Sequence, residues 1–223
     1  MYVPTKEEFL QGIRAFKLKE PRGTVYFEAL KELREGWGDP KAMAGAIAIL
    51  LRSWHLAFYR FGTLDDARLV ECVREQLPAL VAIRERNIDS LDTGDEELIR
   101  NLFNAFRTAL RGGKGGVQES GVAPAKALHL IAPGFLPIWD NAIAYRYGWV
   151  LMWPHDYVFF CWQMKEMAAA VASYMKPDDK CTVLKRVDEF NYSAYTKYWI
   201  SVGHKTDSGQ PVASAAAPTE QEG

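Results

Sequence analysis

Apolar residues recur every three or four positions along most of this 223-residue chain, which is the pattern of amphipathic helices. The clearest case follows Asp95, a residue placed to cap a helix, and comprises Leu98, Ile99, Leu102, Phe103, Phe106, Ala109 and Leu110. Near the start of the chain, Thr5 and Glu8 form a capping-box pattern ahead of a helix expected to end near Lys19. No segment shows the sustained alternation of β-branched and polar residues that marks a strand. The sequence therefore predicts an all-α protein.

Helix-breaking residues divide the remaining apolar stripes. Pro21-Arg22-Gly23 separates the first helix from a second, for which Thr24 is a candidate cap, and Asp39-Pro40 opens a third that we expect to continue to Phe61. Proline at position 78 predicts a kink or a break in the next helix, which Thr63 or Asp65 begins. Later helices are predicted over residues 124–132, 141–147, 157–176 and 182–190, with a last turn or two around residues 195–202.

Composition adds the organisation of the chain. A hydrophobic content of 48% over this length can form one sizeable core, so we expect a single compact multi-helix domain over residues 1–203. From residue 204 to 223 the chain consists largely of Ser, Gly, Pro, Ala, Gln and Glu, and we expect a disordered C-terminal tail.

Charge and short motifs exclude several classes of protein. With 27 Lys and Arg against 28 Asp and Glu, the net charge of −1 provides no general attraction to nucleic acid or to an anionic membrane. The N-terminus lacks the pattern of a signal peptide and no segment is apolar enough to cross a membrane, so a cytoplasmic protein is expected. The three cysteines and four histidines form no C-x-x-C or H-x-x-x-H pair, and neither a metal nor a cofactor is predicted.

The glycine-rich run from Arg111 to Gly116 has two interpretations. Glycines let backbone amides approach an anion closely, so Arg111 and Lys114 are candidates for contact with a polyanion. The run follows a helix, however, and lacks the G-K-[ST] ending of a phosphate-binding loop. A simple linker between helices is the alternative.

The segment from Gly121 to Asn141, GVAPAKALHLIAPGFLPIWDN, contains the candidate chemistry. It resembles the helix-hairpin-helix DNA glycosylases, in which a tight hairpin leads into a helix with a catalytic lysine and an apolar-Pro-apolar-Asp stretch precedes the next helix. Gly121 falls in the hairpin, Lys126 matches the lysine, and Pro137 with Asp140 matches the second element. The resemblance covers about residues 121–141 of the chain.

This resemblance implies base excision from DNA. Lys126 would attack the sugar C1′ and form a Schiff base, which requires a lysine with a lowered pKa. Asp140 would activate that lysine or stabilise positive charge on the sugar, and Trp139 or Trp149 would stack on an extruded base. The structural alternative is that Lys126 is a solvated side chain and Asp140 is only a helix cap.

Two further features of the same region leave the function open. His129 is placed either to tune a neighbouring charge or to sit in the core with its hydrogen bonds satisfied. The aromatic residues between positions 145 and 162, with Arg146 among them, predict either core packing or a stacking pocket. The second functional hypothesis is therefore a non-enzymatic helical binding or assembly module, whose aromatic groove accepts a protein helix or a small planar ligand.

Overall fold

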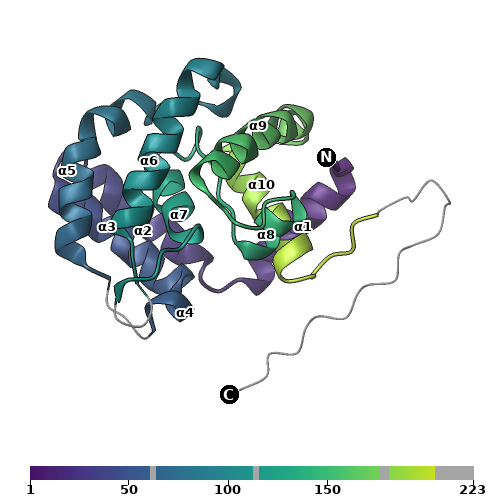
Figure 1. Cartoon of the computed structure of the whole chain (residues 1–223). Helices are drawn as coiled ribbons and strands as arrows, with labels where there is room; N and C mark the ends of the chain where they lie inside the picture. Colours follow the sequence, from purple (N-terminus) through teal and green to yellow (C-terminus); the bar gives the residue numbers. More distant parts are fainter. Residues whose placement is uncertain (61–63, 113–115, 176–180, 204–223) are drawn as a thin grey trace.

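The computed structural model describes residues 1–60, 64–112, 116–175 and 181–203, and in these residues the regular structure is helical (Figure 1). The predicted all-α fold is confirmed. The α-helices are α1 (Lys6–Lys19), α2 (Gly23–Glu35), α3 (Pro40–Trp54), α4 (Leu56–Tyr59), α5 (Asp66–Ile83), α6 (Glu96–Ala109), α7 (Val122–Ile131), α8 (Asn141–Arg146), α9 (Pro154–Val171) and α10 (Val183–Asn191). Short 3₁₀ turns, η1 (Ile88–Ser90), η2 (Thr93–Asp95) and η4 (Ala172–Tyr174), and a π-helical segment, η5 (Tyr192–Thr196), complete the described part. The predicted tail, residues 204–223, lies outside the described residues.

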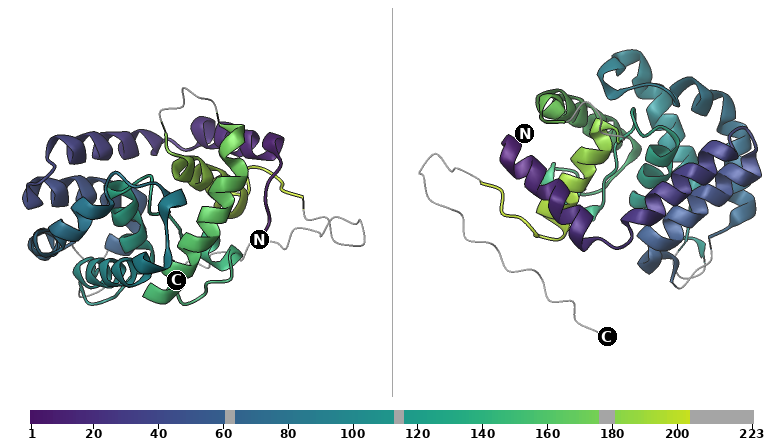
Figure 2. Two further views of the ribbon diagram at one scale, coloured as in Figure 1. Left: turned by 90° about the horizontal axis from the view of Figure 1, so that it is seen from above. Right: turned by 180° about the vertical axis from the view of Figure 1, so that it is seen from behind.

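Helix α7 lies at the centre of the molecule. Helices α2, α3 and α6 all contact it, and every residue of α7 is buried. Beside the α2–α7 group, α1 packs against α10 although the two are far apart in the sequence (Figure 2). Helix α9 packs against both α10 and α6. The first helix, α1, thus lies beside the last helix, α10, and the helices between them in the sequence include the α2–α7 group.

Side-chain caps account for about half of the α-helix starts in the described part of the chain. The capping box of Thr5 and Glu8 is present, and the Asp39 side chain accepts from Lys41 N at the start of α3. Thr24, by contrast, lies inside α2 and its hydroxyl donates to the Pro21 carbonyl, so its predicted role as a cap is wrong. The side chain of Asp95 also makes no cap bond to α6: Arg86 binds both of its carboxylate oxygens, at 2.5 and 2.7 Å, and the Asp92 amide donates to it in the capping box of η2.

Two predicted helix boundaries differ from the structure. Helix α5 runs through Pro78, so the break considered there is excluded. Helix α3 stops at Trp54 instead of continuing toward Phe61, a residue outside the described part, because the backbone at His55 leaves the helical region at φ −136°. In a continuous helix the Phe58 amide would donate to the Trp54 carbonyl. Here the amides of Phe58 and Tyr59 both donate to the His55 carbonyl, so the Trp54 carbonyl is available to another donor.

No helix among the described residues is long and apolar enough to cross a membrane.

Candidate functional site

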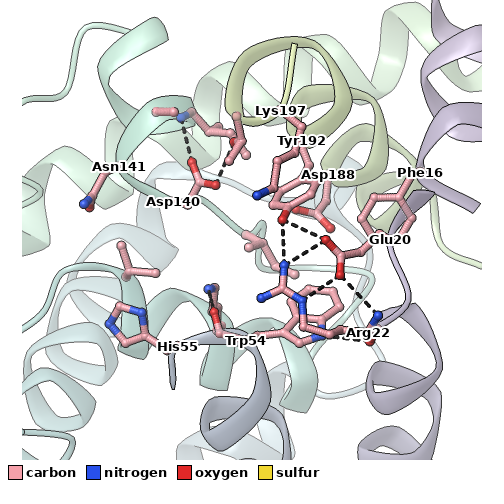
Figure 3. A pocket seen from close by; sticks show the side chains of 16 residues that line it. Phe16, Glu20, Arg22, Trp54, His55, Asp140, Asn141, Asp188, Tyr192 and Lys197 are labelled. Atoms are coloured by element: carbon pink, nitrogen blue, oxygen red, sulfur yellow. Dashed lines mark hydrogen bonds and ion pairs between the residues drawn. The ribbon is translucent and has the colours of Figure 1, made fainter. Parts of the chain in front are cut away.

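An open pocket of about 360 Å³ lies where the N-terminal and C-terminal helices meet the α2–α7 group (Figure 3). Its volume is in the range of pockets that hold small organic ligands. The wall combines acidic, basic and aromatic side chains from the ends of α1 and α3, from α7, from the start of α8 and from α10 with η5. These are Glu20, Asp140 and Asp188; Arg22, Lys126 and Lys197; and Phe16, Trp54, His55 and Tyr192.

Lys126 projects from α7 and is only 7% exposed. Its Nζ donates to the free Trp54 carbonyl at 2.5 Å, the acceptor created by the end of α3. Burial lowers the pKa of Lys126 to about 8, while the nearby carboxylates of Asp140 and Asp188 act in the opposite direction. The alternative in which this lysine is solvated is therefore wrong, and near physiological pH the neutral amine is far more populated than in an ordinary lysine.

Asp140 has the predicted capping role and also faces the pocket. Its Oδ1 accepts from Ile143 N at 2.9 Å at the start of α8, and its Oδ2 accepts from the Thr196 hydroxyl at 2.7 Å (Figure 3). These two bonds fix the carboxylate on the pocket wall. Lys126 and Asp140, both predicted from the sequence, are thus brought together on one cavity.

A third group, made of Glu20, Arg22 and Tyr192, closes another side of the pocket. The Arg22 guanidinium donates to both Glu20 oxygens, at 2.6 and 2.8 Å, and to the Tyr192 hydroxyl at 2.8 Å, which itself donates to Glu20 (Figure 3). Burial acts to raise the pKa of Glu20, but the bonds from Arg22 and Tyr192 outweigh it and lower that pKa to about 2. The ion pair is therefore maintained throughout the neutral range.

Sequence reasoning did not identify these three residues, nor Trp54, His55 or Asp188. Glu20 and Arg22 stand in a Glu-Pro-Arg turn, which indicates only a helix break. Asp188 lies in a segment that is polar in sequence, yet Lys185, Asp188 and Glu189 are all buried. In sequence, this run of charges looks like a solvated helix face. In the structure it is a buried network in which Lys185 pairs with Asp188 and Glu189.

Several predicted site residues lie in the core instead of the pocket. Trp139 is fully buried and donates from Nε1 to the Gly121 carbonyl at 2.8 Å, so it cannot stack on a ligand. His129 is also fully buried, and its two ring nitrogens contact the Tyr26 hydroxyl and the Leu136 carbonyl. It is therefore a core histidine with both hydrogen bonds satisfied. Gly121 accepts the Trp139 bond and packs against Met152, where a Cβ at position 121 would lie 2.5 Å from the Met152 Cβ.

The other candidates lie away from this pocket. Trp149 stacks on Phe159 and donates to Gln163, and Arg146 lies over the Tyr195 ring beside a second hollow. Arg111 pairs with Glu119 at 2.8 Å. Lys114 lies outside the described residues.

Over the residues that the structure describes, no cluster of three or more His, Cys, Asp and Glu side chains is arranged to hold a metal ion. The sequence matches no protein family model, and neither a curated protein nor a solved structure is significantly similar to it.

Proposed function

We propose that this protein is an enzyme of the DNA glycosylase type, with Lys126 as the nucleophile and Asp140 as the catalytic carboxylate. The observation that supports the proposal best is the shared pocket: a buried amine with a pKa of about 8 and a fixed carboxylate line the same open cavity. A lysine nucleophile needs a neutral amine, and partial desolvation supplies it near physiological pH.

In the proposed reaction, the neutral Nζ of Lys126 attacks C1′ of the nucleotide. The C1′–N bond to the base breaks, its electron pair leaves with the base, and the proton released by the amine reaches that base. Opening of the sugar ring breaks C1′–O4′, O4′ takes a proton from solvent, and a protonated Schiff base that keeps the remaining Nζ proton is left between C1′ and Nζ. Water then hydrolyses the Schiff base and regenerates the lysine.

Asp140 would act through its charge. Positive charge develops on the sugar as the C1′–N bond breaks, and a carboxylate that is already fixed stabilises it without reorganisation. The bonds from Ile143 N and Thr196 supply that fixation. Trp139 and Trp149 do not line the pocket, so stacking on the extruded base would instead come from the aromatic side chains that do, Phe16, Trp54 and Tyr192.

Borohydride trapping tests the proposal. Incubation with an abasic-site duplex and sodium borohydride reduces the Schiff base to a stable secondary amine, so a covalent protein–DNA complex should form with Lys126 as the modified residue. Lys126→Arg, which keeps the positive charge, should abolish the complex. Lys17→Ala changes an exposed lysine outside the pocket and should leave its yield unchanged.

Two outcomes would contradict the proposal. One is failure of the wild-type protein to form the complex with abasic duplexes and with a panel of duplexes bearing damaged bases. The other is trapping that persists in Lys126→Arg. Binding of such duplexes without trapping would instead favour the non-enzymatic binding module.

A further inference from the structure

A chain of hydrogen bonds connects the start of α7 to the pocket through Ser120 and His55. The Ser120 Oγ accepts from the backbone amides of Val122 and Ala123, at 3.1 and 3.3 Å. The same oxygen lies 2.9 Å from His55 Nε2. Nothing in the proposed reaction uses these two side chains.

The two amide bonds determine the direction of the third. A serine hydroxyl has one proton and two acceptor lone pairs. Because Val122 N and Ala123 N take the lone pairs, the Ser120 proton is left to donate to His55. His55 Nε2 must then be the unprotonated nitrogen of the ring, and in a neutral imidazole the proton lies on Nδ1.

The surroundings of His55 keep the ring neutral. Burial is the main cause, and the positive charge of Lys126 adds to it, so that the pKa of His55 falls to about 3. The ring is also held in place by stacking on Phe58, with the two ring centroids 4.9 Å apart. One tautomer in one orientation is therefore expected throughout the neutral pH range.

His55 Nδ1 has no hydrogen-bond partner within residues 1–60, 64–112, 116–175 and 181–203. Over those same ranges, Arg107 Nε is the one side-chain nitrogen or oxygen atom that is both closed to solvent and without a hydrogen-bond partner. Because His55 Nδ1 also lacks a partner but is not such an atom, solvent must reach it. The imidazole lines the pocket on the wall below Asn141 (Figure 3). A donor with a fixed direction is left for whatever occupies the cavity.

We propose that His55 is a specificity-determining residue for an uncharged heteroaromatic ligand, a nucleobase or a close analogue. Its Nδ1–H donates to an acceptor atom on the edge of the ligand ring. Ser120 is the positioning residue that fixes the tautomer of His55. The inference rests on the proposed function only for the nucleobase as ligand. The tautomer itself depends on the Ser120 contacts alone.

The charges of the pocket favour an uncharged ligand. Glu20 is paired with Arg22 and Asp188 with Lys185, at 2.6 and 2.8 Å, and Lys126 and Asp140 line the same cavity. The aromatic side chains Phe16, Trp54 and Tyr192 supply faces and edges for a planar ring. Specificity then depends on hydrogen bonding at the ring edge, where an unmatched donor carries a desolvation penalty.

Nitrogen-15 NMR of the histidine ring tests the tautomer without any ligand. In wild-type protein at pH 7, Nδ1 of His55 should give a protonated-type resonance and Nε2 an unprotonated-type one. Ser120→Ala removes the donor to Nε2 and should shift the ring toward a mixture of tautomers, while Ser120→Thr keeps the hydroxyl and should restore the wild-type pattern. A wild-type ring protonated at Nε2, or at both nitrogens, would overturn the inference.

Titration with free adenine, guanine, cytosine and uracil tests the ligand. At least one base should bind wild-type protein and shift the His55 Nδ1–H resonance. His55→Phe should weaken that base about tenfold, the effect of one lost hydrogen bond with its partner left unsatisfied. His55→Asn, whose amide N–H lies near the position of Nδ1, should recover most of the affinity.

The outcomes of the two tests are independent of each other. Binding of none of the four bases, or equal binding by wild type and His55→Phe, overturns the recognition role of His55. Borohydride trapping on Lys126 is measured separately with abasic DNA, which has no base for His55 to contact. Trapping without base recognition therefore contradicts this inference alone, and base recognition without trapping contradicts the proposed enzyme alone.

Discussion

The Asp140 carboxylate has a structural role, as a helix cap, beside the catalytic role that we propose for it. It caps α8 through Ile143 N and accepts from the Thr196 hydroxyl, and it faces the pocket with a negative charge. Because asparagine caps helices as well as aspartate, the two roles can be separated by substitution.

We predict that Asp140→Asn changes the free energy of unfolding by less than about 1 kcal/mol, since the cap is kept. The same change should slow borohydride trapping on a duplex that still carries the base to be excised by about 100-fold or more, because the charge that stabilises the transition state of C1′–N cleavage is lost. Asp140→Ala should lose the cap as well, at about 0.5–2 kcal/mol. Urea denaturation and single-turnover trapping measure the two effects. Full trapping activity in Asp140→Asn would exclude a catalytic role for this carboxylate.

Lys126 couples the stability of the fold to pH. Its pKa is about 8 in the folded protein, against an ordinary value of 10.5. Between these values the unfolded chain holds more protons than the folded one, so the lysine makes stability rise with pH in this window, by up to about 1.4 kcal/mol per unit. Below about pH 8 its unfavourable contribution is complete and constant.

We therefore predict that the difference in unfolding free energy between wild type and Lys126→Met changes in favour of wild type as the pH rises from 8 to 10.5. Urea denaturation of both proteins at several pH values measures it. Parallel stability curves would mean that the lysine is not buried in solution.

At the scale of the element, the end of α3 determines the site. Its termination at His55 frees the Trp54 carbonyl for Lys126 and turns the histidine ring toward the pocket. The sequence could not reveal this break, because the apolar pattern continues through residues 54–61 with no proline or glycine before position 62. The competing interactions come from distant residues: the Trp54 indole donates to the Arg22 carbonyl and stacks on Tyr26. Local patterns do not contain such contacts.

The close approach of α1 to α10 shapes the opposite wall of the pocket. A Cβ at Gly12 would lie 2.8 Å from Phe190 Cδ2 and 3.1 Å from Phe190 Cα, and the Ser193 hydroxyl donates to the Gly12 carbonyl at 2.8 Å. Phe16 and Glu20 on or just after α1, and Asp188 on α10, depend on this packing for their positions in the cavity.

We predict that Gly12→Ala destabilises the protein by about 1–3 kcal/mol, because the added methyl group forces the two helices apart. Gly45 is the matched control, since it lies within α3 and a Cβ there meets nothing within 4 Å. Gly45→Ala should stabilise the protein by about 0.5–1 kcal/mol through helix propensity alone. Thermal or urea denaturation compares the pair, and equal effects of the two changes would contradict the close packing.

At the scale of the whole molecule, the balance of charge limits how strongly the proposed DNA substrate could be bound. The net charge is −1, and the basic side chains on the pocket are Arg22, Lys126 and Lys197, of which Arg22 is already bound to Glu20. Few phosphates can therefore be neutralised around this cavity.

We predict a shallow salt dependence for binding of an abasic duplex. With about two phosphate contacts, the affinity should fall only about tenfold between 50 and 200 mM salt, whereas six to ten contacts would lower it about 10³–10⁵-fold. Fluorescence anisotropy at several salt concentrations measures the slope. A steep slope would point to a basic surface away from the pocket.

Sequence reasoning succeeded where the determinants are local. The helical periods and the caps at Thr5 and Asp140 could be predicted from neighbouring residues, whereas a common site for Lys126 and Asp140 was suggested only by the resemblance over residues 121–141. Ser120 and His55 could not be predicted, since they are 65 positions apart and meet only through the tertiary fold. Trp139 was misplaced because an aromatic residue beside a candidate aspartate looks the same in sequence whether it faces a cavity or the core.

The end of the described chain lies close to its start, which has a practical consequence. The Gly203 amide donates to Glu8 at 3.0 Å, so the last described residue lies beside the first helix. A short linker from residue 203 to residue 1 would close the polypeptide into a ring, which could then be reopened at the exposed turn between α2 and α3, at Gly38. Such a circular permutant would place α10 and α1, which together shape one wall of the cavity, next to each other in the sequence as well as in space.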